Sequence, residues 1–231
     1  MKYKNRDISS KIEYFITAVL VVWFGYFVYQ YYTDREISSL AQEQSGIEFL
    51  PPPNASDHYK WKNDETPYTI VNYFSMDCPH CKELDAIEEK NRIAYEKAFS
   101  LIYRHSPLAI QPLSGEKAVI AECVYNQLGD EEMFKFISDS YVHYEAFSRN
   151  NVWIQNLAKK YSKNISLLEG CFSGEEMKGF INDKKNEAAS YGVRGTPTIA
   201  VFKEGVLLLR LDTVGENSVR RVMDYLVDRK N

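Results

Sequence analysis

The sequence predicts an α/β fold: a small central sheet with helices on both faces, an inserted all-helical domain, and one transmembrane helix ahead of them. Three patterns predict this arrangement. Strand-like and helical segments alternate in residues 67–108 and again in residues 191–231, whereas residues 109–190 carry only helical periodicity. Near the N-terminus, residues 14–32 contain no charged side chain.

The N-terminal segment is predicted to be a cytoplasmic basic tail, residues 1–11, followed by a membrane anchor, residues 12–32. At about 1.5 Å per residue, the uncharged run nearly spans a hydrocarbon core of roughly 30 Å. The basic flank is expected to stay in the cytoplasm, so the rest of the chain is expected outside it. A cleaved signal peptide is the alternative, because Ser39-Leu40-Ala41 resembles a cleavage site. Both interpretations give the same compartment.

Residues 33–66 are predicted to form a stalk between the anchor and the folded domain. Thr33–Gln44 is polar and suits an exposed helix, and Pro51-Pro52-Pro53 favours an extended, semi-rigid chain. Little in this segment is expected to bury a core.

The remaining elements follow from local patterns. Strands are predicted where β-branched and aromatic residues cluster, over 68–73, 98–104, 198–202 and 206–211. Helices are predicted from apolar spacings of three and four, over 83–98, 114–128, 131–147, 151–162, 173–191 and 217–228. Ser173-Gly174-Glu175-Glu176 is expected to be a capping box, and Lys203-Glu204-Gly205 a tight hairpin turn.

Composition and charge narrow the class of protein. The net charge is −4 and no basic stripe is present, so a nucleic-acid partner is not expected. Four cysteines are too few for a disulfide scaffold. His58, His105 and His143 are scattered, and each is expected in packing or on the surface rather than in a metal site.

Cys78-Pro79-His80-Cys81 lies where a predicted strand gives way to a predicted helix. Unpaired N–H groups and the helix dipole stabilise a thiolate at such a position. A Cys-x-x-Cys pair is either half of a zinc site or a redox dithiol. Neither a second Cys-x-x-Cys nor a His-x-His lies nearby, which favours a redox pair that needs no metal or bound cofactor.

The residues around the two cysteines are expected to tune them. Pro79 suits the first helical position, because proline has no N–H to leave unpaired. His80 is expected to favour the Cys78 thiolate by a hydrogen bond or a positive charge. Asp77 opposes the thiolate if its carboxylate turns inward, and Lys82 is expected to offset it in part.

Phe74-Ser75, Cys78-Pro79-His80-Cys81 and Gly195-Thr196-Pro197-Thr198 together resemble the DsbA family of thiol:disulfide oxidoreductases, over residues 66–231. The resemblance implies a thioredoxin-like fold with an inserted helical domain. It also implies an exposed, attacking Cys78, a buried Cys81, and a cis Pro197 against the pair. The Thr196 backbone would pair with substrate. The implied partners are unfolded cysteine-containing proteins and a DsbB-like, quinone-linked membrane protein that reoxidises the pair.

Two positions depart from the family pattern. Asn72 stands six positions before Cys78, where relatives often carry an acid thought to exchange protons with the buried thiol. Another group or a water must then serve Cys81. Thr196 is also common before the cis-proline of isomerases and reductases, so it weakens a purely oxidising assignment.

Cys123 and Cys171 are predicted to form a structural disulfide within the helical insertion, since unpaired thiols are unusual outside the cytoplasm. Two buried free cysteines and a second redox pair are the alternatives.

The sequence therefore predicts a thiol:disulfide oxidase of the bacterial inner membrane, with a periplasmic catalytic domain. The alternatives are a reductase or isomerase of the same fold, and a membrane-tethered chaperone or assembly factor.

Overall fold

The computed structural model describes residues 14–25, 28, 49–108, 110, 113–147, 151–212 and 215–230. The chain divides into two compact units, Met1–Ser45 and Gly46–Asn231. In the first unit, residues 14–25 form a helix. No helix within the described ranges is both long and apolar enough to cross a membrane. The predicted basic tail, most of the predicted anchor outside 14–25, and residues 33–48 of the predicted stalk lie outside the described residues.

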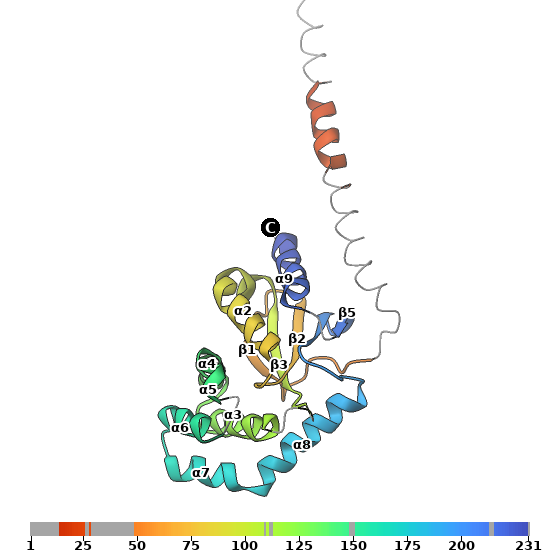
Figure 1. The fold of residues 1–231 in the computed structure, drawn as a ribbon. Coiled ribbons are helices and arrows are strands. Elements are labelled where there is room, and N and C mark those ends of the chain that lie inside the picture. The colour runs from red at the N-terminus through yellow and green to blue at the C-terminus, as the bar shows by residue number, and fades with distance from the viewer. Residues whose placement is uncertain are drawn as a thin grey trace, which may run out of the picture. The chain divides into compact units, whose positions relative to one another are not determined.

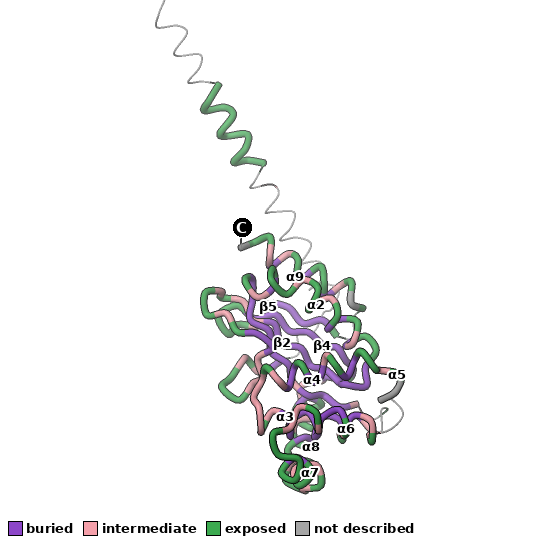
Figure 2. Tube along the Cα trace, turned by 90° about the vertical axis from the view of Figure 1, so that its left-hand side faces the viewer, coloured by how far each residue is buried: buried purple, intermediate pink, exposed green. Residues whose placement is uncertain are grey.

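The second unit is built on a five-stranded sheet with the order β1-β3-β2-β4-β5 (Figure 1). The strands are β1 (His58–Trp61), β2 (Tyr68–Phe74), β3 (Ser100–His105), β4 (Thr198–Lys203) and β5 (Val206–Asp212). β2 and β3 run parallel, and the other neighbours are antiparallel. β2 is therefore the central strand, and Figure 2 shows β2 and β4 as largely buried.

Helices pack on both faces of this sheet. The helices described in this unit are α2 (Pro79–Ala98), α3 (Ser114–Leu128), α4 (Asp130–Val142), α5 (Tyr144–Phe147), α6 (Asn151–Tyr161), α7 (Ile165–Ser173), α8 (Glu175–Ser190) and α9 (Glu216–Lys230). The side chain of Tyr103 reaches α2, whereas Val71 and Ala200 pack in one buried cluster with Ala188 at the end of α8. Because side chains alternate along a strand, α2 and α8 cover opposite faces. The predicted α/β fold with a helical insertion is confirmed.

The folded domain begins before the predicted boundary at residue 66. Leu50 is only 1% exposed and packs in the core, and β1 pairs with β3 at the edge of the sheet. Arg104 fixes the proline segment between them, donating hydrogen bonds to the carbonyl oxygens of Pro51 and Pro52 at 2.8 and 2.9 Å. These contacts make residues 50–61 part of the domain rather than a stalk.

The helical region also differs from the prediction in three details. The helix expected over 131–147 breaks at His143 into α4 and α5, and α7 was not predicted. The expected capping box is absent, since Gly174 is the N-cap of α8 without a side-chain hydrogen bond. The Ser173 hydroxyl instead donates back to the Glu169 carbonyl at 2.5 Å. The hairpin turn is as predicted, with positive φ at Glu204 and Gly205.

Candidate active site

The two cysteines of the motif lie where the central strand leads into α2. β2 ends at Phe74, Cys78 is the N-cap residue of α2, and Pro79 occupies its first turn. The first N–H groups of a helix have no partner within it. Here the backbone N–H groups of His80 and Cys81 are hydrogen-bonded to the Cys78 sulfur. The backbone N–H groups at the start of α2 therefore point toward the Cys78 sulfur.

This environment lowers the pKa of Cys78 to about 6, from an ordinary value of 9.0. The main cause is a hydrogen bond from the Cys81 thiol, which outweighs the opposing effect of burial. Thr196 and the two backbone N–H groups add to the lowering. At neutral pH most of the Cys78 side chains are thiolates, which is the reactive form.

Cys81 has the opposite character. It is 2% exposed, and burial together with the Cys78 interaction raises its pKa well above the ordinary value. The reduced pair therefore consists of a Cys78 thiolate and a protonated Cys81, and Cys78 is the more nucleophilic atom. The resemblance implied an exposed Cys78, but this residue is only 3% exposed, and its sulfur lies 3.0 Å from the Thr196 carbonyl oxygen.

The Thr196-Pro197 peptide bond, just before β4, is cis. The Thr196 carbonyl meets the Cys78 sulfur across a sequence separation of 118 residues. The Thr198 hydroxyl donates to the Gly195 carbonyl at 2.9 Å and so ties down the same turn. The structure thus places together four residues that the sequence singled out: Cys78, Cys81, Thr196 and Pro197.

His80 is the residue predicted to favour the Cys78 thiolate by a hydrogen bond or a positive charge. Its side chain is 55% exposed, and Nδ1 lies 3.0 Å from the Glu83 carboxylate. The backbone N–H of His80 is one of the hydrogen-bond donors that lower the pKa of Cys78.

A buried ion pair beside Cys78 was missed by sequence reasoning. The Asp77 carboxylate pairs with Lys117 of α3, whose side chain is fully buried. Burial raises the pKa of Asp77 and lowers that of Lys117, while their pairing opposes both shifts. Lys82, the expected partner, lies over the Tyr144 ring instead, with Nζ 5.3 Å from its centre. No sequence pattern links positions 77 and 117, so only the fold reveals the pair.

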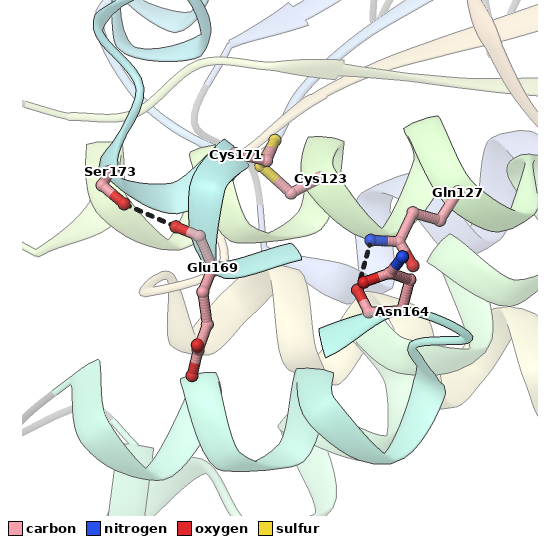
Figure 3. Close-up of a disulfide and its surroundings, with 6 residues drawn as sticks. All are labelled: Cys123, Gln127, Asn164, Glu169, Cys171 and Ser173. Atoms are coloured by element: carbon pink, nitrogen blue, oxygen red, sulfur yellow. Dashed lines mark hydrogen bonds between the residues drawn. A yellow bond between two sulfur atoms is a disulfide. The ribbon is translucent and has the colours of Figure 1, made fainter. Parts of the chain in front are cut away.

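Cys123 and Cys171 form a disulfide that joins α3 to α7, with a Cα–Cα distance of 5.8 Å (Figure 3). Next to it, Asn164 caps α7 by accepting a hydrogen bond from the Leu167 N–H at 3.0 Å. Gln127 of α3 donates to the Asn164 carbonyl at 3.2 Å. The bond and these contacts hold α7 against α3.

Two of the histidines expected to be scattered meet at one carboxylate. Nε2 of His58 and Nε2 of His105 lie 3.2 and 3.3 Å from Glu122, and Nδ1 of His58 lies 2.9 Å from Asp130. The carboxylates overcome the effect of burial and raise the pKa of His58 to about 9. Within the described ranges, no group of His, Cys, Asp and Glu is arranged to hold a metal ion.

Comparison with known proteins agrees with this geometry. The family model described as Thioredoxin matches residues 62–209, so the chain belongs to the thioredoxin family. No curated protein matches the sequence.

Solved structures of DsbA-type proteins share the fold. α-DsbA1 of Wolbachia pipientis is 17% identical, with a TM-score of 0.61, and the match covers 77% of this chain and 94% of that one. BdbD of Bacillus subtilis is 16% identical, with a TM-score of 0.61 and coverage of 77% and 96%. DsbA2 of Pseudomonas aeruginosa is 20% identical, with a TM-score of 0.55 and coverage of 75% and 96%. Fold and site together indicate a thiol–disulfide oxidoreductase.

Proposed function

We propose that this chain is an extracytoplasmic thiol:disulfide oxidase that donates the Cys78–Cys81 disulfide to folding proteins. One observation carries the proposal. The sulfur of Cys78 lies at the N-terminus of α2 with its pKa lowered to about 6, while the pKa of Cys81 is raised. Such a pair forms the mixed disulfide with a substrate at Cys78 and keeps a proton on Cys81.

The exchange proceeds in two displacement steps. A substrate thiolate attacks the Cys78 sulfur, the Cys78–Cys81 bond breaks, and Cys81 leaves with the electron pair and takes up one proton. A second substrate thiolate then attacks the substrate sulfur of the mixed disulfide, and Cys78 leaves as a thiolate. Two electrons pass to the cysteine pair. Of the two substrate protons, the solvent takes one, and the other is matched by the proton gained at Cys81.

The lowered pKa favours this direction because it stabilises the reduced pair. At pH 7, a thiol of pKa about 6 gains roughly 1.4 kcal/mol from ionisation relative to a thiol of pKa 9.0. That difference makes the disulfide more oxidising by about 30 mV.

Location and partners form part of the proposal. Residues 12–32 would anchor the chain in the bacterial inner membrane, with a cytoplasmic N-terminus and a periplasmic catalytic domain. The disulfide between Cys123 and Cys171 supports an oxidising compartment. Unfolded cysteine-containing proteins would be substrates, and a DsbB-like, quinone-linked membrane protein would reoxidise the pair.

A single-turnover assay tests the activity. The oxidised full chain is mixed with an excess of a reduced two-cysteine peptide, and the products are alkylated and weighed by mass spectrometry. We expect one peptide disulfide per chain, and none with Cys78→Ser. A Cys123→Ala/Cys171→Ala variant serves as the control and should retain the activity. Equal oxidation by Cys78→Ser and wild type would refute the mechanism, and the absence of oxidation by wild type would favour a reductase, an isomerase or a chaperone.

A further inference from the structure

Two buried acids follow Cys81 along the same face of α2. Asp85 lies four residues and Glu88 seven residues after Cys81, so the three side chains stack on successive turns. All three are buried, and Glu88 is completely inaccessible to solvent. A buried carboxylate is costly unless it is paired, so this arrangement requires partners from outside the helix.

Lys60 of β1 supplies the principal partner. Its Nζ lies 2.7 Å from Asp85, 2.9 Å from Glu88 and 3.0 Å from the half-exposed Glu89. Two hydroxyl groups complete the cluster. Tyr103 donates to Glu88 at 2.5 Å, and Ser138 of α4 donates to Asp85 at 3.1 Å. Three carboxylates thus surround one ammonium group, which leaves an excess of negative charge in the interior.

The inner end of this cluster lies one helical turn after Cys81. Tyr141 of α4 is fully buried and interacts electrostatically with both Cys81 and Asp85. Its hydroxyl donates to the Ser75 carbonyl at 3.3 Å, and the Ser75 backbone is hydrogen-bonded to the Cys81 sulfur. Cys81 and Asp85 are therefore linked through common polar neighbours as well as by helix geometry.

The outer end of the cluster opens to solvent. A cleft of about 710 Å³ lies between β1, α2 and α4, and Lys60, Glu89 and Ser138 line it. Ser138 contacts Asp85 and the half-exposed Glu89 contacts Lys60, so the cleft borders on partners of the buried carboxylates.

Unpartnered polar atoms lie on the same face of the sheet. Glu88 Oε1 and both side-chain polar atoms of Asn72 are buried and have no hydrogen-bond partner among the described residues. Asn72 is the register partner of Tyr103, so its side chain points toward α2. An amide does not titrate, so Asn72 cannot itself take or release the proton of Cys81. Carboxylates can.

From this arrangement we infer that Asp85 and Glu88 carry the proton of Cys81 to and from the water in this cleft. The inference rests on the proposed function. When a substrate thiolate opens the disulfide, Cys81 leaves with the electron pair and takes a proton from the carboxyl cluster, which regains one from water. When the disulfide closes, Cys81 returns its proton to the cluster, and its thiolate displaces the substrate sulfur from Cys78.

The protonation state of Glu88 suits such a transfer. Burial raises its pKa to about 6 in spite of Lys60, so protonated and ionised forms coexist near neutral pH. Tyr103 and Tyr141 have pKa values far above the ordinary range, chiefly through burial, and stay neutral. The titratable groups that face the two acids are Cys81, Glu89 and Tyr95 on α2, Lys60 on β1, Tyr103 on β3 and Tyr141 on α4.

The test uses glutathione as the probe and the full chain as the protein. The Cys78–glutathione mixed disulfide is prepared at low pH and then shifted to pH values between about 5 and 9, where the cluster titrates. The rate at which Cys81 expels glutathione is followed by acid quench and mass spectrometry. We expect Asp85→Asn and Glu88→Gln to slow this step about 10²-fold at neutral pH. Their rates should then rise about tenfold per pH unit, because the relay needs both carboxylates and hydroxide replaces it as the base.

Two controls separate proton transfer from structural damage. Glu122→Gln also removes a buried carboxylate but should keep the wild-type pH profile. Alkylation of Cys78 by iodoacetamide should keep its pH dependence in every variant. If circular dichroism shows that Asp85→Asn does not fold, Glu88→Gln and the solvent deuterium effect on the wild-type rate are used to test the inference.

The possible outcomes separate the proton-transfer inference from the proposed oxidase function. If wild type expels glutathione and both variants show the same pH profile, the inference is overturned and the proposed function stands. A wild-type rate without a deuterium effect also overturns the inference. If wild type neither forms nor resolves the mixed disulfide, both the inference and the proposed function are refuted.

Discussion

Replacing Lys117 by Met should disable the active site electrostatically while leaving its cysteines in place. The buried ammonium balances the Asp77 carboxylate, which directly precedes Cys78. Without Lys117, the Asp77 carboxylate would lose this balancing charge at the site where the thiolate forms. For two charges about 7 Å apart at an effective dielectric constant of about 20, the repulsion is about 2.4 kcal/mol, or about 1.7 pKa units. We therefore expect the pKa of Cys78 to rise from about 6 toward 8.

The measurement is the rate of iodoacetamide alkylation of Cys78 as a function of pH. Asp77→Asn should lower the apparent pKa of Cys78, and the double variant Asp77→Asn/Lys117→Met should return it close to the wild-type value. Lys82→Met is the matched control, because Lys82 is the lysine nearest in sequence but lies over Tyr144. A folded Lys117→Met protein with an unchanged Cys78 pKa would refute the reasoning.

The single variant should also unfold more easily. Removing one partner of a buried ion pair costs about 3–5 kcal/mol, because the other charge stays buried. The double variant should recover most of this loss in urea denaturation, and a larger loss in the double variant would mean that the pair is not the cause.

Three further predictions concern stability. Cys123→Ala/Cys171→Ala opens a loop with a sequence separation of 48, so urea denaturation should show a loss of about 4 kcal/mol; no loss would contradict the disulfide. The pKa of His58 is raised to about 9, so its contribution to stability is complete below about 6.5 and disappears as the pH rises to about 9. His58→Gln should flatten the pH dependence of the melting temperature over this interval, and an unchanged curve would contradict the cluster. Arg104→Ala removes the donors that hold Pro51 and Pro52, so limited proteolysis should cut residues 50–57 sooner than in wild type.

Local signals account for the features that the sequence predicted well. The strand before Cys78, the Pro79 at the first helical turn and the Gly205 hairpin each depend on residues close to one another. Such preferences act within a few residues and need no knowledge of the fold. The same is true of the helical periodicity that marked residues 109–190 as an insertion.

Features that depend on distant partners were missed or misjudged. β1 has four residues of mixed polarity and becomes a strand only by pairing with β3. The burial of Lys117 follows from the position of α3, and that of Glu88 from Lys60 and Tyr103. A charged residue on a helix is ordinarily predicted to face solvent, and only the packed structure reverses that expectation.

The reduction potential of the Cys78–Cys81 pair, measured against glutathione at pH 7, tests the central claim most directly. A thiolate stabilised at the start of α2 predicts a value clearly more oxidising than about −270 mV, because the lowered pKa of Cys78 contributes about 30 mV in that direction. A potential of about −270 mV or lower, typical of a reductase, would contradict it.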